Sequence, residues 1–79
     1  MDTKKLRWRA RRGMRELDVL LTRFLDNQFG ETDAATQRRF ESLLEHDDPQ
    51  LYSWLTRRQL HSDPDMQDLI TRIISEHTG

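Results

Sequence analysis

The chain has 79 residues, of which 34% are apolar and 34% are charged, and it contains no cysteine. The lack of cysteine excludes a disulfide framework, thiol catalysis and a thiolate zinc site. A chain of this length hides only about 60% of its unfolded surface on folding, which leaves little volume for an enclosed substrate cavity. These limits favour one small domain over residues 1–79 that works through its surface, as a binding module rather than an enzyme.

The charge is distributed unevenly along the chain. Residues 1–15 hold seven basic residues and one acid, a net charge of +6, whereas residues 16–79 carry a net charge of −7. Such a basic arm can steer the chain to an anionic partner, or it can fold as a solvated helix face beside its own acidic body; both readings stay open. No apolar run exceeds three residues and the N-terminus has no signal-peptide stretch. We therefore expect a cytoplasmic protein that does not insert into a membrane.

Two helices are predicted in the first 28 residues. Residues 4–12 place Leu6 and Ala10 four apart, and Gly13 follows as a residue that ends helices in the left-handed conformation. Residues 14–28 carry apolar side chains at i, i+3, i+4, i+7 and i+8, which is one face of a helix. This stripe consists of Leu17, Leu20, Leu21, Phe24 and Leu25.

A third helix is predicted over residues 33–46, with Thr32 or Asp33 as the N-cap. Together with the helices that follow, it supplies the second half of the expected core. The core is predicted to comprise Leu17, Leu20, Leu21, Phe24, Phe40, Leu43, Leu44, Leu51, Trp54, Leu55, Ile70 and Ile73.

Two further helices are predicted to begin at an Asp-Pro dipeptide. Asp48 precedes Pro49, and Asp63 precedes Pro64. Aspartate as N-cap followed by proline at the first helical position is a strong start signal, because proline lacks only an N–H that would be unpaired there. No stretch shows the alternation of a β-strand. The sequence therefore predicts an all-α fold, a compact bundle of five short helices.

The sequence offers no set of residues for catalysis or metal binding. The histidines, His46, His61 and His77, have no i, i+4 spacing, and each lies near a predicted helix end, where a surface or capping role is usual. The glycines cannot form a phosphate-binding loop, and no serine lies in a nucleophile pattern. We therefore predict no catalytic residue and no metal ligand.

One segment, residues 8–18, concentrates cations, an aromatic residue, a glycine and two acids around a predicted helix junction. Each feature has a structural explanation. Gly13 can be only a cap, Arg12 and Glu16 can be only a surface ion pair, and Trp8 can be a core anchor.

The same segment also has a functional interpretation. An arginine such as Arg12 binds carboxylates or phosphates through two parallel hydrogen bonds. Gly13, without a Cβ, lets another backbone approach closely, and Met14 is an adaptable side chain of the kind found on interaction surfaces. Together they predict a flat, polar docking patch rather than a pocket.

The patch resembles the signature of a known family. Residues 12–18 read RGMRELD and match the RGxxE motif of the small flavinylation factors of succinate dehydrogenase and fumarate reductase. The family is called SdhE in bacteria and succinate dehydrogenase assembly factor 2 in mitochondria. The likeness continues through residues 40–45 and 47–49 and then through Leu51 and the Trp54-Leu55 pair, so it covers nearly the whole chain.

The resemblance implies a specific function. Family members bind the flavoprotein subunit of succinate dehydrogenase or fumarate reductase and promote covalent attachment of FAD to a histidine of that subunit. They are assembly chaperones and not enzymes. The resemblance implies no tightly bound cofactor, because FAD is attached within the partner; whether the factor contacts FAD directly stays open.

The resemblance also names the partner-binding residues. These are Trp8, Arg11, Arg12, Gly13, Met14, Arg15, Glu16 and Asp18. We expect Arg12 and Arg15 to pair with partner carboxylates or carbonyls, and Glu16 to accept hydrogen bonds from the partner or to orient Arg12.

Two alternatives remain at this stage. Some members of the family carry the label of antitoxin, and the basic arm could serve a small nucleic-acid-binding module. The acidic body disfavours nucleic acid, because it repels phosphate, and no basic recognition helix is evident. We expect a monomer, with a dimer left open.

Overall fold

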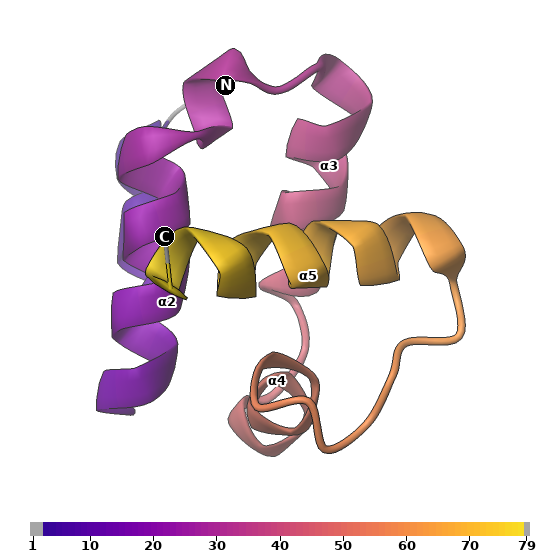
Figure 1. Ribbon diagram of the computed structural model, residues 1–79. Helices are drawn as coiled ribbons and strands as arrows, with labels where there is room; N and C mark the ends of the chain where they lie inside the picture. Colours follow the sequence, from indigo (N-terminus) through magenta and orange to yellow (C-terminus); the bar gives the residue numbers. More distant parts are fainter. Residues whose placement is uncertain (1–2, 79) are drawn as a thin grey trace.

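A computed structural model describes residues 3–78, with side chains described up to Ser75. In this part of the chain the structure contains five α-helices, one short 3₁₀ helix and no strand (Figure 1). The elements are α1 (Thr3–Ala10), α2 (Arg15–Asn27), η1 (Phe29–Glu31), α3 (Ala34–Leu43), α4 (Asp48–Leu55) and α5 (Pro64–Thr78). The predicted all-α class and the five helices are confirmed.

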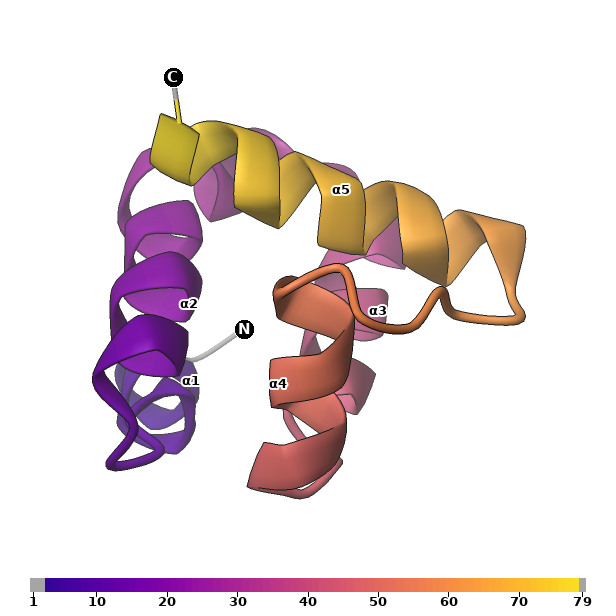
Figure 2. The ribbon, with the colours of Figure 1, turned by 60° about the horizontal axis from the view of Figure 1, so that its bottom comes forward.

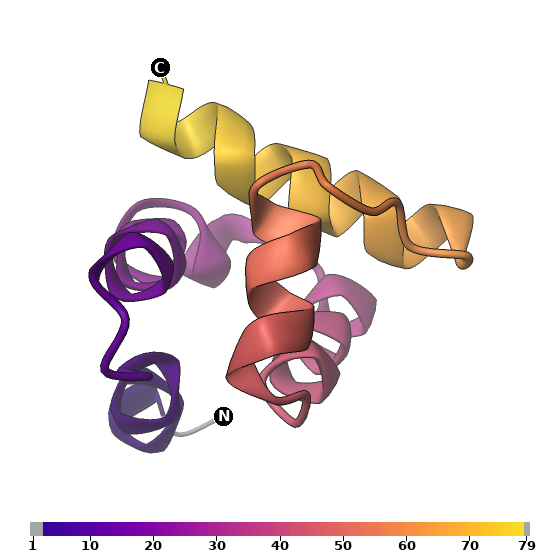
Figure 3. The ribbon, with the colours of Figure 1, turned by 90° about the horizontal axis from the view of Figure 1, so that it is seen from below.

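Helix α2 is central to the packing. It makes its main contacts with α5, which crosses it, and with α1, which lies beside it (Figures 2 and 3). α4 lies across the molecule from α1 and contacts α2 and α5. This arrangement leaves the α1–α2 connection at one end of α2, next to the turn between α3 and α4.

One cluster of buried side chains forms the core. All twelve predicted core residues belong to it. The cluster also contains seven further side chains: Leu6, Ala10, Leu25, Phe29, Met66, Leu69 and Ile74. Phe40 stacks on Phe24 at a ring-centroid distance of 5.2 Å and meets Phe29 at 5.5 Å, which joins α2, η1 and α3 through aromatic contacts.

Aspartate side chains begin three of the helices. Asp33 accepts a hydrogen bond from the backbone N–H of Thr36, which confirms it as the N-cap of α3. Asp63 accepts from the backbone N–H of Asp65 at the start of α5. The prediction for α4 was wrong by one residue, because Asp47 is the N-cap, accepting from the N–H of Gln50 at 3.2 Å. Asp48 is therefore the first residue of α4.

The rings of His46 and His61 contact the indole of Trp54, at centroid distances of 4.8 and 4.7 Å. His61 also accepts a hydrogen bond from the N–H of Asp63 through Nδ1, which ties the loop to the start of α5. Two of the three histidines thus lie near helix ends, as predicted, and the side chain of His77 lies outside the described part. No described helix is long and apolar enough to cross a membrane.

Candidate functional site

The connection between α1 and α2 is a sharp corner made by residues 11–14. The backbone N–H of Arg12 donates a hydrogen bond to Oδ1 of Asp18 at 2.6 Å. Asp18 lies in the first turn of α2, where a carboxylate also suits the positive end of the helix dipole. Asp18 thus faces inward and fixes the backbone of the corner.

Gly13 adopts the left-handed conformation at the corner, with φ of +85°. Helix α1 ends at Ala10, two residues earlier than predicted, so Gly13 turns the chain between the helices instead of following the last helical residue directly. A Cβ built on Gly13 would meet no atom within 4 Å. The requirement for glycine therefore comes from the backbone, and the space in front of it is open.

The outward side chains of the corner are those of Arg11, Arg15 and Glu16, all exposed. Met14 is half-buried and packs against the core. Trp8 is 79% exposed, so its interpretation as a core anchor is wrong. An exposed indole beside exposed cations is a contact surface that aromatic, apolar or anionic groups can use.

An open groove between α1 and α2 runs past Trp8. Its volume is about 440 Å³. It is lined by Lys4, Arg7, Trp8, Arg11, Asp18, Val19, Thr22 and Asp26. An ion pair between Arg7 and Asp26 links the two helices, and the hydrogen bond and charge of Asp26 raise the pKa of Arg7 above its ordinary value. Part of the basic arm therefore folds against the acidic body.

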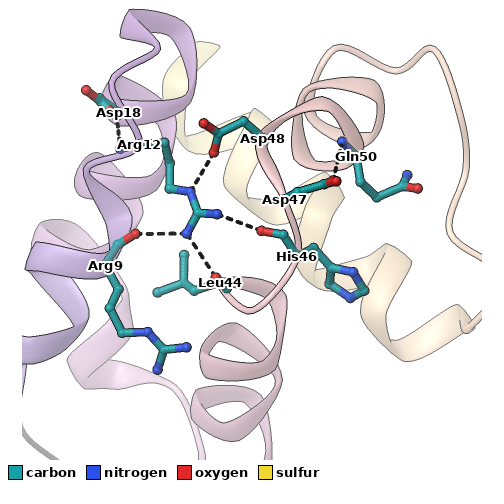
Figure 4. A network of polar contacts seen from close by, with 8 residues as sticks. All are labelled: Arg9, Arg12, Asp18, Leu44, His46, Asp47, Asp48 and Gln50. Carbon is teal, nitrogen blue, oxygen red and sulfur yellow. Dashed lines mark hydrogen bonds and ion pairs between the residues drawn. The ribbon is translucent and has the colours of Figure 1, made fainter.

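The guanidinium of Arg12 lies between the end of α1 and the α3–α4 turn and is bonded to both (Figure 4). Nε donates to Oδ1 of Asp48 at 2.8 Å, and Nη2 donates to the carbonyl of His46 at 2.6 Å. Nη1 donates to the carbonyls of Arg9 at 3.2 Å and Leu44 at 2.9 Å.

This network corrects two expectations about Arg12. The side chain is 18% exposed and its ion-pair partner is Asp48, not Glu16. Four of the five guanidinium N–H groups are directed at acceptors within the chain, so pairing of Arg12 with partner carboxylates does not fit the geometry. Of the two arginines expected to do so, Arg15 alone is exposed.

Sequence reasoning missed Asp48 as a member of the site, because it assigned this carboxylate to the cap of α4. The available signal was the Asp47-Asp48 pair: one helix start needs one cap, which leaves the second carboxylate for another partner. Within the described residues, no group of three histidine, aspartate or glutamate side chains could hold a metal ion.

The chain is similar to known proteins over nearly its whole length. A family described as "Flavinator of succinate dehydrogenase" matches residues 4–77. A protein named FAD assembly factor SdhE from Pseudomonas aeruginosa is 38% identical over 73 residues, 92% of this chain and 87% of the relative. The protein of the same name from Coxiella burnetii is also 38% identical, over 92% of this chain and 89% of its own length. That from Aliivibrio fischeri is 49% identical over 54 residues, 68% of this chain and 63% of its own. The family match includes both the corner and the α3–α4 turn.

Proposed function

Because the chain belongs to the family of flavinators of succinate dehydrogenase, we propose that it is an FAD assembly factor that acts in the cytoplasm. It binds the flavoprotein subunit of succinate dehydrogenase or fumarate reductase and promotes covalent attachment of FAD to that subunit. The observation that carries this proposal is the corner, where exposed Glu16 lies close to Gly13 and the open space in front of it.

Each outward residue of the corner has a role that its chemistry supports. Glu16, exposed at the start of α2, accepts hydrogen bonds from partner N–H groups. Arg15 pairs with a partner carboxylate. The open space at Gly13 admits a partner backbone at close range. Trp8 supplies a large, rigid contact area at the edge of the same surface.

The chain contributes binding and not bond making. The groove between α1 and α2 is open and does not enclose a molecule of the size of FAD. We therefore assign the flavin and the residue that it modifies to the flavoprotein, which supplies the chemistry. The factor favours the arrangement of the flavoprotein in which the two groups can react, as any ligand favours the state that it binds best.

The test uses apo flavoprotein, FAD and variants of the factor, with covalent flavin read by fluorescence of the denatured protein in a gel. Glu16→Ala should lower the yield at limiting factor by about tenfold, which corresponds to one charged hydrogen bond. Gly13→Arg should also lower it, because the new side chain fills the open space in front of the corner.

The control for Glu16→Ala lies beyond the other end of α2. Glu31 is exposed in η1, and the part of α2 from Glu16 to Asn27 alone spans about 16 Å, so Glu31→Ala should keep the wild-type yield. Gly13→Ala has the same left-handed backbone without a long side chain, so it is the control for Gly13→Arg and should also keep the yield. Wild-type fluorescence for Glu16→Ala and Gly13→Arg, with helical circular dichroism intact, would exclude the corner as the active surface.

A further inference from the structure

Arg12 joins the α1–α2 corner to a segment that lies 32 to 36 residues away in the sequence. Its backbone N–H is bonded to Asp18 on α2, while its guanidinium reaches the turn between α3 and α4 and the first residue of α4 (Figure 4). The main helix contact of α1 is with α2, whereas the guanidinium of Arg12 is bonded to carbonyls of the α3–α4 turn. Arg12 thus bridges the two sides of the molecule through polar contacts.

The surroundings of the guanidinium suit a cation with several donors. The carbonyl of Arg9 lies at the end of α1, and Leu44 is the C-cap of α3. The C-terminal end of a helix carries partial negative charge, and Asp48 adds a full one. A lysine ammonium has three donors at one point and cannot reach acceptors spread around a planar group. The site therefore requires arginine for its shape as well as its charge.

The position of Arg12 immediately before Gly13 makes this bridge relevant to docking. Glycine has the widest backbone freedom of any residue, so the direction of the chain at Gly13 depends on how its neighbours are held. Arg12 is held on both its backbone and its side chain.

We propose, on the basis of the function proposed above, that Arg12 is a positioning residue and that Asp48 is its essential partner. The pair holds the corner against the α3–α4 turn, so that Gly13, Arg15 and Glu16 are presented to the flavoprotein in one fixed arrangement. Neither Arg12 nor Asp48 contacts the flavoprotein in this role.

A double-mutant cycle on binding tests the proposal. The dissociation constant of the factor for apo flavoprotein is measured for Arg12→Gln, Asp48→Ala and the double variant. Each single change should raise it by about tenfold, and the double variant should bind no more weakly than Arg12→Gln, because both changes break one link. Arg12→Lys should not restore affinity. At saturating factor the flavin yield of Asp48→Ala should return to that of wild type, since every contact residue is intact.

Other results would contradict a positioning role for Arg12. If Arg12 touched the partner directly, Arg12→Lys would keep most of the affinity, Asp48→Ala would bind as wild type, and the proposal would fall. A core change on the opposite side, Ile74→Val, serves as the control for lost stability and should leave the dissociation constant unchanged; a rise equal to that of Asp48→Ala would reduce Arg12 to a general stabilising residue. Should Arg12→Gln not fold, Asp48→Ala and Arg12→Lys carry the same comparison.

Hydrogen exchange on the free factor separates this proposal from the proposed function. The amides of Glu45 and His46 are bonded within the α3–α4 turn. They should exchange faster in Arg12→Gln and Asp48→Ala, while amides within α5 keep their rates. If the wild-type factor fails to bind flavoprotein while the two variants show this exchange pattern, the proposed function is overturned and the link between Arg12 and Asp48 stands. Unchanged exchange at both amides overturns the link itself.

Discussion

Neighbouring residues at the corner have opposite orientations. The side chain of Arg12 is bonded to the α3–α4 turn and to Asp48, whereas Gly13, next to it, is exposed and has a φ of +85°. Asp18 likewise bonds within the chain, through the backbone N–H of Arg12, whereas Glu16 is exposed. The seven residues of the signature thus include some that hold the corner in place and others that are exposed on it. The motif letters alone do not distinguish these two groups.

The backbone of Gly13 leads to a stability prediction. Alanine fits the space at this position but not the left-handed conformation, so Gly13→Ala should lower the free energy of unfolding by about 1 kcal/mol. Gly30 is the matched control, because its φ is not in the left-handed region and a Cβ there also meets nothing within 4 Å. Denaturant unfolding measures both variants. Equal stabilities for Gly13→Ala and Gly30→Ala would contradict the argument.

The sequence contained a signal for the exposure of Trp8 that the prediction did not use. Trp8 stands two residues from Leu6 and two from Ala10, so it faces away from the side of α1 that those residues bury. Its exposure could have been predicted from that spacing. The partners of Arg12 could not, because Leu44, His46 and Asp48 lie 32 to 36 residues away and two of them act through backbone carbonyls, which any residue type provides.

At the scale of the helices, caps and loops decide the boundaries. The stripe on α2 predicted a helix within one residue of its observed ends, because five apolar positions at helical spacing leave little freedom. The third helix ends at Leu43 instead of 46, since the chain must turn there toward α4. The 3₁₀ helix at Phe29 was missed, because a three-residue element has no periodicity to detect.

The cap of α3 gives a prediction about pH. Hydrogen bonding by Thr36, through its side chain and then its backbone, lowers the pKa of Asp33. The folded chain therefore holds the proton less tightly than the unfolded chain does. The stabilisation by Asp33 is complete at neutral pH and is lost as the pH falls through the lowered pKa.

The measurement compares denaturant unfolding of wild type and Asp33→Ala from neutral to acid pH. The wild type should be more stable at neutral pH, and the difference should shrink toward zero at the acid end. Asp68→Ala, at an exposed aspartate within α5, is the control for the loss of a carboxylate that caps no helix. A difference between wild type and Asp33→Ala that stays constant over this range would exclude the cap as its source.

Across the whole molecule, the charge asymmetry is partly neutralised by folding. Arg7 pairs with Asp26 and Arg12 with Asp48, so at least two of the seven cations in the first fifteen residues face the acidic body. Arg11 and Arg15 remain exposed near Glu16. A surface that carries both positive and negative charges suits a protein partner with a complementary arrangement of charges. It is less suited to a nucleic-acid backbone, whose charge is uniformly negative.

The same division between interior and corner predicts two different ways to lose function. Leu21 is fully buried in the core, so Leu21→Ala should cost about 2–5 kcal/mol, a large share of the stability of a domain this small. Its melting temperature, followed by circular dichroism, should fall by about 10 °C or more, and its flavinylation activity should fall with the folded fraction. Glu16→Ala, at an exposed position, should melt as wild type and still give about a tenfold lower flavin yield at limiting factor. Flavin yield assayed at limiting factor, well below each melting temperature, separates the two variants, because cooling restores the yield of Leu21→Ala and leaves that of Glu16→Ala low. A Leu21→Ala variant that melts as wild type would show that the buried face of α2 does not hold the fold.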